Sequence, residues 1–149
     1  MKRLICLVLI LLSVMSTGIA DPVFVTASQL NGRARPSRKA SVEARFDFGD
    51  SIEATGEWSK DHNWIQVEGG ETGVVWVSID YVSAIDAPYY AVNEAYRSVK
   101  IRKRPVDGKV TGTLKRGKKV EIDAAVLGWG HCSNGWIDLS YLEAVDDGE

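Results

Sequence analysis

The same arrangement of side chains occurs twice in this chain, as Val75-Trp76-Val77-Ser78-Ile79-Asp80-Tyr81-Val82 and as Gly135-Trp136-Ile137-Asp138-Leu139-Ser140-Tyr141-Leu142. In each stretch a tryptophan stands five positions before a tyrosine, and an aliphatic residue follows that tyrosine. A second tryptophan lies upstream of each stretch, in Trp64-Ile65-Gln66-Val67 and in Trp129-Gly130-His131-Cys132. A recurrence of this kind predicts an internal duplication.

Further landmarks extend the duplication toward the start of each copy. The first copy opens with Leu30-Asn31-Gly32-Arg33-Ala34-Arg35-Pro36, and the second with Val99-Lys100-Ile101-Arg102-Lys103-Arg104-Pro105. The offset between equivalent positions falls from 69 residues at these two prolines to 60 residues at the two tyrosines. The sequence therefore predicts two copies of one small fold whose loops differ in length.

Within each copy the residue pattern is that of β-strands. Polar and apolar residues alternate in Ser51-Ile52-Glu53-Ala54 and in Lys119-Val120-Glu121-Ile122, as in a half-buried strand. Glu68-Gly69-Gly70-Glu71 and Ser133-Asn134-Gly135 suit hairpin turns, because Gly and Asn tolerate positive φ. We therefore expect an all-β chain with about five short strands in each copy, each sheet closing on itself so that its edges are protected.

This pattern resembles the bacterial Src homology 3 family. The matching residues are Leu30-Asn31-x-Arg33-x-x-Pro36-Ser37, Phe46-x-x-Gly49-Asp50, Trp64-x-x-Val67, Val75-Trp76-Val77 and Tyr81-Val82. The resemblance implies two tandem SH3-like small β-barrels, which we place at residues 24–84 and 90–145. A linker at 85–89 would join them, because Pro88 blocks continued strand pairing, and an acidic tail at 146–149 would follow.

The second copy departs from the family pattern in its first loop. Lys100 stands where the family usually has Asn, and Pro105 lacks the Ser that usually follows. In both copies the proline that opens the last motif of peptide-binding members is replaced, by Ser78 and by Asp138. These replacements disfavour a groove for polyproline peptides.

The first twenty residues have the order of a secretory signal peptide. Lys2 and Arg3 precede an apolar run at residues 4–12, and small residues lead to Ala20, after which we expect cleavage. The run is too short to span a membrane as a helix, which takes about 20 apolar residues. We therefore expect an extracytoplasmic protein, periplasmic or secreted, without stable membrane insertion.

Cysteine usage agrees with a fold held by its cores. Cys6 lies in the predicted signal peptide, so Cys132 would be the one thiol of the mature chain and no intrachain disulfide could form. Such a thiol either lies half-buried in a strand or bridges two chains. We expect the first arrangement and a monomer.

The mature chain offers few groups for catalysis. His62, His131 and Cys132 are its usual nitrogen and sulfur ligands or nucleophilic partners, and adjacent His131 and Cys132 in a strand would point to opposite faces. The spacing of these residues fits no metal site, and the glycines open no phosphate-binding helix. We expect a protein that is not an enzyme and has no cofactor.

Aromatic side chains are the leading candidates for ligand contacts, since they suit stacking on sugars or docking of peptides. By resemblance to the family, Trp64 with Tyr81, and Trp129 with Tyr141, fall where ligand-facing aromatics lie. The other interpretation is that aromatics fill two small cores, and we assign Trp76 and Trp136 mainly to the cores.

Charge separates the two copies. Residues 24–83 hold 6 basic and 9 acidic residues, whereas residues 90–144 hold 10 basic and 6 acidic residues. The basic residues of the second copy gather in two places, listed in chain order as Arg102, Lys103 and Arg104, then Lys115, Arg116, Lys118 and Lys119. They form either a patch that attracts anions or an ordinary solvated rim. As candidate ligand-binding residues we select Arg102, Arg104, Lys115 and Arg116.

The leading functional hypothesis is a non-catalytic binder of peptidoglycan or another anionic envelope polymer. The main alternative is an extracytoplasmic adaptor or inhibitor that binds an envelope protein, and a remote hydrolase is a third. Nucleic acid is disfavoured by export and by the acidic net charge, which is −2 for the full chain. The fold by itself does not rank these alternatives, because small barrels of this kind host many functions.

Overall fold

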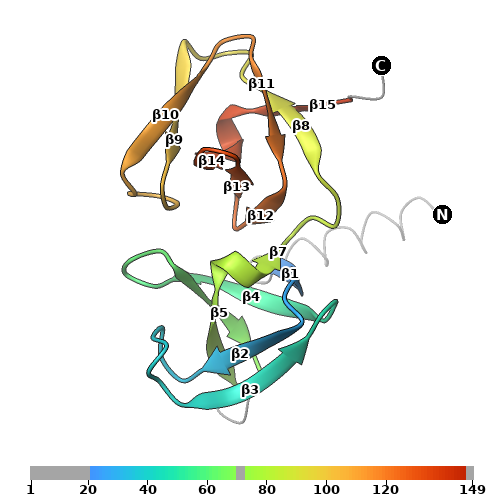
Figure 1. Cartoon of the computed structure of the whole chain (residues 1–149), viewed down its shortest axis with the longest axis vertical. Helices are drawn as coiled ribbons and strands as arrows, with labels where there is room; N and C mark the ends of the chain where they lie inside the picture. The colour runs from blue at the N-terminus through green and yellow to red at the C-terminus, as the bar shows by residue number, and fades with distance from the viewer. Residues whose placement is uncertain (1–20, 70–72, 147–149) are drawn as a thin grey trace, which may run out of the picture.

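The structure is a computed structural model that describes residues 21–69 and 73–146. The predicted signal peptide at 1–20 lies outside the described residues, as do residues 70–72 of one predicted turn and 147–149 of the predicted tail. Across the described ranges, no helix has the length and apolar character needed to cross a membrane. Antiparallel strands make up both halves of the molecule, which are stacked along its long axis (Figure 1), and the predicted all-β fold class is confirmed.

The N-terminal half, residues 21–83, consists of seven strands and one short 3-10 helix. In chain order they are β1 (Asp21–Val25), β2 (Gln29–Arg33), β3 (Val42–Asp47), β4 (Ser51–Trp58), β5 (Trp64–Glu68), β6 (Val74–Ser78), η1 (Ile79–Tyr81) and β7 (Val82–Ser83).

The C-terminal half, residues 89–145, has the corresponding elements. They are β8 (Tyr89–Val92), β9 (Ser98–Arg102), β10 (Val110–Lys115), β11 (Lys119–Ile122), β12 (Ala124–Val126), β13 (Trp129–Cys132), β14 (Gly135–Asp138), η2 (Leu139–Tyr141) and β15 (Glu143–Val145).

Strand order repeats between the halves. The first sheet runs β3-β2-β6-β5-β4-β1-β7, and the C-terminal half runs β10-β9-β14-β13-β12 and then, as a separate sheet, β11-β8-β15. The two orders are the same once β4 is matched to β12 and β11 together. Asp123 separates β11 from β12. At the equivalent place β4 is continuous but has a register shift between Ala54 and Trp58, around Gly56 at φ +97°. Each half has more than the five strands expected, because the short terminal strands β1 and β7, or β8 and β15, pair with each other.

Each half has its own apolar core, built from the inward side of its alternating strands. In the N-terminal half, Ile65 and Val67 of β5 and Val75 and Val77 of β6 are fully buried. In the C-terminal half the core is built around Ile101, Ile122 and Ile137. Side chains on the other side of these strands remain available for contacts outside the core.

The two halves also contact each other directly. Val126 of β12 and Trp136 of β14 are buried in the same apolar cluster as the N-terminal core, and Leu127 and Trp129 pack against that cluster. The C-terminal end of β7 lies beside β12 (Figure 1). There the Ala84 amide donates to the Ala125 carbonyl at 2.6 Å and the Ala125 amide donates to Ser83 Oγ at 3.1 Å. The halves therefore share an interface made of apolar contacts and hydrogen bonds.

The two tryptophans assigned to the cores differ in environment. Trp136 is 4% exposed and belongs to the cluster at the interface between the halves. Trp76, at the equivalent place in β6, is only half-buried, because it points away from the core into which Val75 and Val77 project. The assignment of Trp76 to the core is therefore wrong. Trp136 is buried, on the sheet face opposite Ile137 of the C-terminal core.

Candidate ligand grooves

Each half carries a groove at the same place in its fold, between the second strand and the 3-10 helix. The C-terminal groove has a volume of about 470 Å³ and the N-terminal groove about 250 Å³. Trp129 and Tyr141 line the C-terminal groove, and Trp64 and Tyr81 line the N-terminal one. The four aromatic candidates therefore lie in two equivalent grooves.

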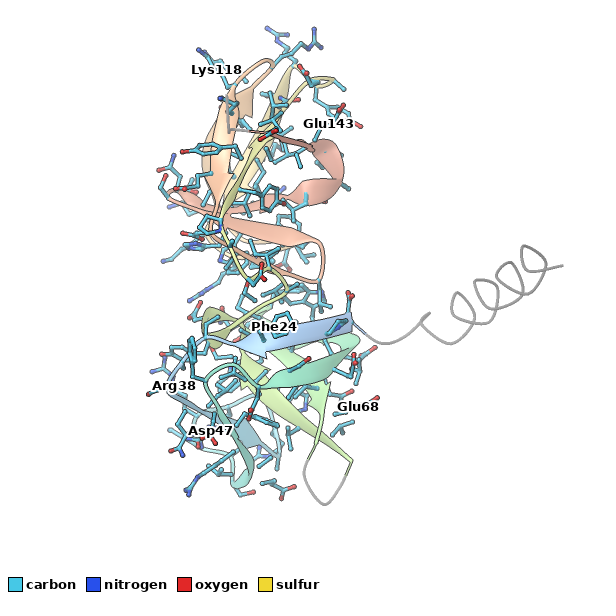
Figure 2. All side chains as sticks on the ribbon, turned by 90° about the vertical axis from the view of Figure 1, so that its right-hand side faces the viewer. Phe24, Arg38, Asp47, Glu68, Lys118 and Glu143 are labelled. Atoms are coloured by element: carbon cyan, nitrogen blue, oxygen red, sulfur yellow. The ribbon has the colours of Figure 1, made fainter. Side chains whose placement is uncertain are left out.

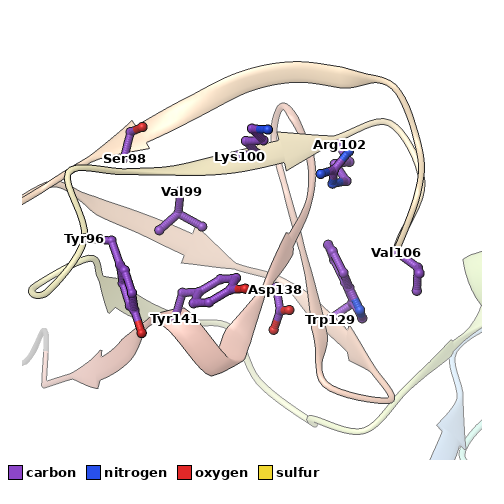
Figure 3. A pocket seen from close by; sticks show the side chains of 9 residues that line it. All are labelled: Tyr96, Ser98, Val99, Lys100, Arg102, Val106, Trp129, Asp138 and Tyr141. Atoms are coloured by element: carbon purple, nitrogen blue, oxygen red, sulfur yellow. The ribbon is translucent and has the colours of Figure 1, made fainter.

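The C-terminal groove is an aromatic row facing a basic strand. Figure 3 shows Tyr96, Tyr141 and Trp129 in succession below β9, with Asp138 between the last two. The rings of Tyr96 and Tyr141 meet edge to face, with centroids 5.0 Å apart, and their side chains are 46% and 45% exposed. Exposed rings that support one another offer flat apolar surface to a ligand at little conformational cost.

A fully buried asparagine holds Tyr96 in place. Asn93 Nδ2 donates to the carbonyls of Tyr96 at 2.8 Å and Leu114 at 2.9 Å, and Asn93 Oδ1 accepts from the Tyr96 amide at 3.0 Å. These bonds pin the turn between β8 and β9. The sequence did not lead us to select Tyr96, and no pattern in it marks Asn93.

An arginine occupies the same position in both grooves. Arg102 Nη1 donates to the Gly108 carbonyl, and Arg33 Nη1 donates to the Ala40 carbonyl, each at 2.9 Å. One nitrogen of each guanidinium therefore ties the first loop of its half to the groove. Since guanidinium has five N–H donors, the rest of the group can contact a ligand anion.

The other charged lining residues differ between the grooves. Lys100 and Asp138 line the C-terminal groove, and Arg38 lines the N-terminal one. Asp138 Oδ1 accepts from the amide and the hydroxyl of Ser140, at 2.9 Å and 2.7 Å, so it caps η2. Both grooves therefore combine aromatic surface with cationic groups, although the N-terminal half as a whole is acidic.

Trp64 is held by a turn that includes Asp61. Asp61 Oδ1 accepts from Ser59 Oγ at 2.7 Å and from the Asn63 amide at 3.0 Å, and Ser59 Oγ in turn accepts from the Trp64 amide at 3.0 Å. Desolvation raises the pKa of Asp61, but the hydrogen bonds from Ser59 and Asn63 outweigh it and lower the pKa below 3.8.

Three of the candidate basic residues lie outside the groove linings. Arg104 Nη1 is 3.8 Å from Asp80 Oδ1, so it contacts the N-terminal half. Arg116 Nη2 donates to the Ala95 carbonyl at 3.2 Å, beside the turn that carries Tyr96, and Lys115 is exposed at the end of β10. Figure 2 places Lys118, in the turn between β10 and β11, at the end of the molecule farthest from the N-terminal half.

The chemically reactive residues do not form a site in the described structure. His131 Nδ1 is 2.7 Å from Asp123 Oδ1 and its ring packs edge to face on Trp136, whereas Cys132 is buried in the core on the opposite side of β13. Burial raises the pKa of the Cys132 thiol, which keeps it in the unreactive form. Among residues 21–69 and 73–146, no group of three His, Cys, Asp or Glu side chains is placed to hold a metal ion.

Comparison with known proteins gives only distant likenesses. No protein-family model matches the chain, and no curated protein matches it. The structure is similar to NlpC2 from Trichomonas vaginalis at 12% identity and a TM-score of 0.36, covering 87% of this chain and 51% of that one. NlpC1 from the same organism is 16% identical with a TM-score of 0.36, covering 83% of this chain and 45% of that one. The endolysin LysPBC5 CBD is 15% identical with a TM-score of 0.33, covering 86% of this chain and 95% of that one. The chain spans about half the length of the two NlpC proteins.

Proposed function

We propose that this protein is an exported, non-catalytic member of the bacterial SH3 group whose grooves bind peptidoglycan or another anionic envelope polymer. The observation that carries the proposal is the composition of the C-terminal groove. The exposed rings of Tyr96 and Tyr141 and the half-buried ring of Trp129 lie beneath the basic side chains of Lys100 and Arg102. Sugar rings stack on aromatic faces, and peptide-stem carboxylates pair with guanidinium and ammonium groups, so a wall polymer satisfies both sides of the groove.

Other observations support a binding role over catalysis. The nucleophile and histidine of β13 point to opposite faces, and the Cys132 thiol is buried. Export is supported by the signal-like pattern of residues 1–20.

Co-sedimentation of the mature protein with purified cell-wall sacculi tests this function. We expect the protein to sediment at low ionic strength and to be released by salt, because exposed charge pairs are screened. Tyr141→Ser should weaken sedimentation while the far-ultraviolet spectrum stays unchanged, since the side chain is 45% exposed.

Phe48→Ser is the matched control, because Phe48 is an exposed aromatic on the β3–β4 turn and lines neither groove. If wild-type protein stays in the supernatant at low ionic strength, the wall is not its ligand. Chemical crosslinking to a protein in wall-free extracts would then favour the adaptor alternative.

A further inference from the structure

The loop between β9 and β10 joins the rims of the two grooves. Arg102 and Val106 of this region line the C-terminal groove, and Arg104 between them contacts Asp80 of the N-terminal half. Asp80 lies next to Tyr81, which lines the N-terminal groove. The contact between the halves at this point is therefore also the boundary between the grooves.

A second contact fixes the same loop. His62 Nδ1 is 3.1 Å from Asp107 Oδ1, at ion-pair distance although without the angles of a hydrogen bond. His62 and Val106 both have left-handed backbones, with φ of 60° and 73°. That conformation is costly for a β-branched residue such as Val106, so the surrounding contacts must hold the loop in it. The loop therefore contacts the N-terminal half at two places, through Arg104 and through Asp107.

The boundary remains open to solvent. The side chains of Arg104 and Asp80 are 38% and 50% exposed, so an extended ligand can lie across them. Cations stand on both sides, Arg33 and Arg38 in one groove and Lys100 and Arg102 in the other. An anionic chain therefore meets favourable charge in each groove.

We propose that the two grooves form one composite site, which a single linear anionic polymer occupies by entering both grooves across the Asp80–Arg104 contact. This inference rests on the proposed function and specifies its ligand as a chain longer than one repeat unit. Because the interface holds the grooves at a fixed separation, the second groove is filled at high effective concentration and at little further cost in chain entropy.

Isothermal titration calorimetry with two defined probes tests the composite site. One probe is a muropeptide monomer, a single disaccharide with its peptide stem, and the other is an uncrosslinked glycan chain of several such units. We expect the long chain to bind with one chain per protein and roughly 100-fold tighter than the monomer. Tyr81→Ser and Tyr141→Ser, each in an exposed residue, should both reduce long-chain affinity to about that of the monomer, and Phe48→Ser should change neither.

Exchanging the charges of Asp80 and Arg104 tests the boundary without changing a residue that lines either groove. Arg104→Asp places two carboxylates together where the anionic chain crosses, and we expect a several-fold loss of long-chain affinity with monomer affinity unchanged. Combining Asp80→Arg with Arg104→Asp should restore long-chain binding. Equal affinity for both probes with two long chains per protein would overturn the composite site while leaving wall binding intact. Failure of wild-type protein to bind either probe would overturn both.

Discussion

The two halves of this molecule share one strand order, but the outer faces of two equivalent strands, β6 and β14, have different surroundings. In β6 the outward-facing Trp76 is half-exposed, whereas in β14 the equivalent Trp136 is buried with the N-terminal core. Both tryptophans pair with an arginine of the neighbouring strand, Arg33 or Arg102. The duplication therefore supplied the same side chain twice, and docking of the halves gave one copy a structural role.

Replacing each tryptophan by alanine should give the largest difference between the halves, measured as the free energy of unfolding. Trp136→Ala should lower the free energy of unfolding by about 3 to 5 kcal/mol, because it empties a buried site. Trp76→Ala should cost only about 1 to 2 kcal/mol, since much of its surface already contacts water. Urea denaturation followed by circular dichroism measures both values, and equal losses would contradict the assigned environments.

Core packing shows a second difference between the halves. Across β2, β6 and β5 the strand register lines up Gly32, Val77 and Ile65, and across β9, β14 and β13 it lines up Ile101, Ile137 and Gly130. The glycine and the isoleucine have changed places. A Cβ at Gly130 would lie 2.7 Å from Leu139 Cδ2, and a Cβ at Gly32 would lie 2.6 Å from Val75 Cγ2. The space left by each glycine is filled by its neighbours.

Gly130→Ala should therefore destabilise the protein by about 1 to 3 kcal/mol through overpacking. Gly112→Ala is the control, because a Cβ there meets only Ile101 Cδ1, at 4.0 Å. Thermal unfolding of the two variants compares them directly. A Gly130→Ala protein as stable as the wild type would show that the C-terminal core has room to spare.

Cys132 offers a milder comparison, since Val67 holds the equivalent position in β5 and both side chains are buried. Cys132→Val should cost less than about 1.5 kcal/mol, because volume and polarity change little. In the folded wild type the thiol should react with a disulfide reagent only as fast as the protein opens, since the side chain is buried out of reach of the reagent and burial also raises its pKa. Rapid labelling of native protein would place the thiol at the surface instead.

The turns before the groove tryptophans should differ in their response to acid. Hydrogen bonds lower the pKa of Asp61 below 3.8 in the folded state, so its stabilising effect is present above about pH 4 and is lost as the pH falls through the folded value. The turn before Trp129 consists of Leu127 and Gly128, which do not titrate. The effect should be small, because Asp61 is largely solvated.

Asp61→Asn should flatten this part of the stability profile. Urea midpoints measured from pH 5 down to pH 3 for wild type and variant would reveal it. The same slope in both proteins would exclude Asp61 as its source.

Much of the groove was predictable from the sequence. The tyrosine that ends each 3-10 helix and the tryptophan that opens each hairpin recur in order, and resemblance to a known family assigns them to a groove. Sequence reasoning placed Arg104 in a ligand patch because it follows two other basic residues, Arg102 and Lys103, and it could not foresee Asp80 across the interface.

By itself, the sequence determined the strand pattern and the duplication, because strand alternation and turn residues act over a few neighbouring positions. Resemblance to a known family, rather than residue spacing, selected Trp64, Tyr81, Trp129 and Tyr141 for the grooves, and it did not select Tyr96. Tertiary structure alone decided that Trp136 is buried while Trp76 is not, that Asn93 anchors Tyr96, and that Arg104 lies at the rim between two grooves. These features depend on contacts between residues far apart in the chain, and local side-chain periodicity does not encode which outer face a neighbouring half will cover.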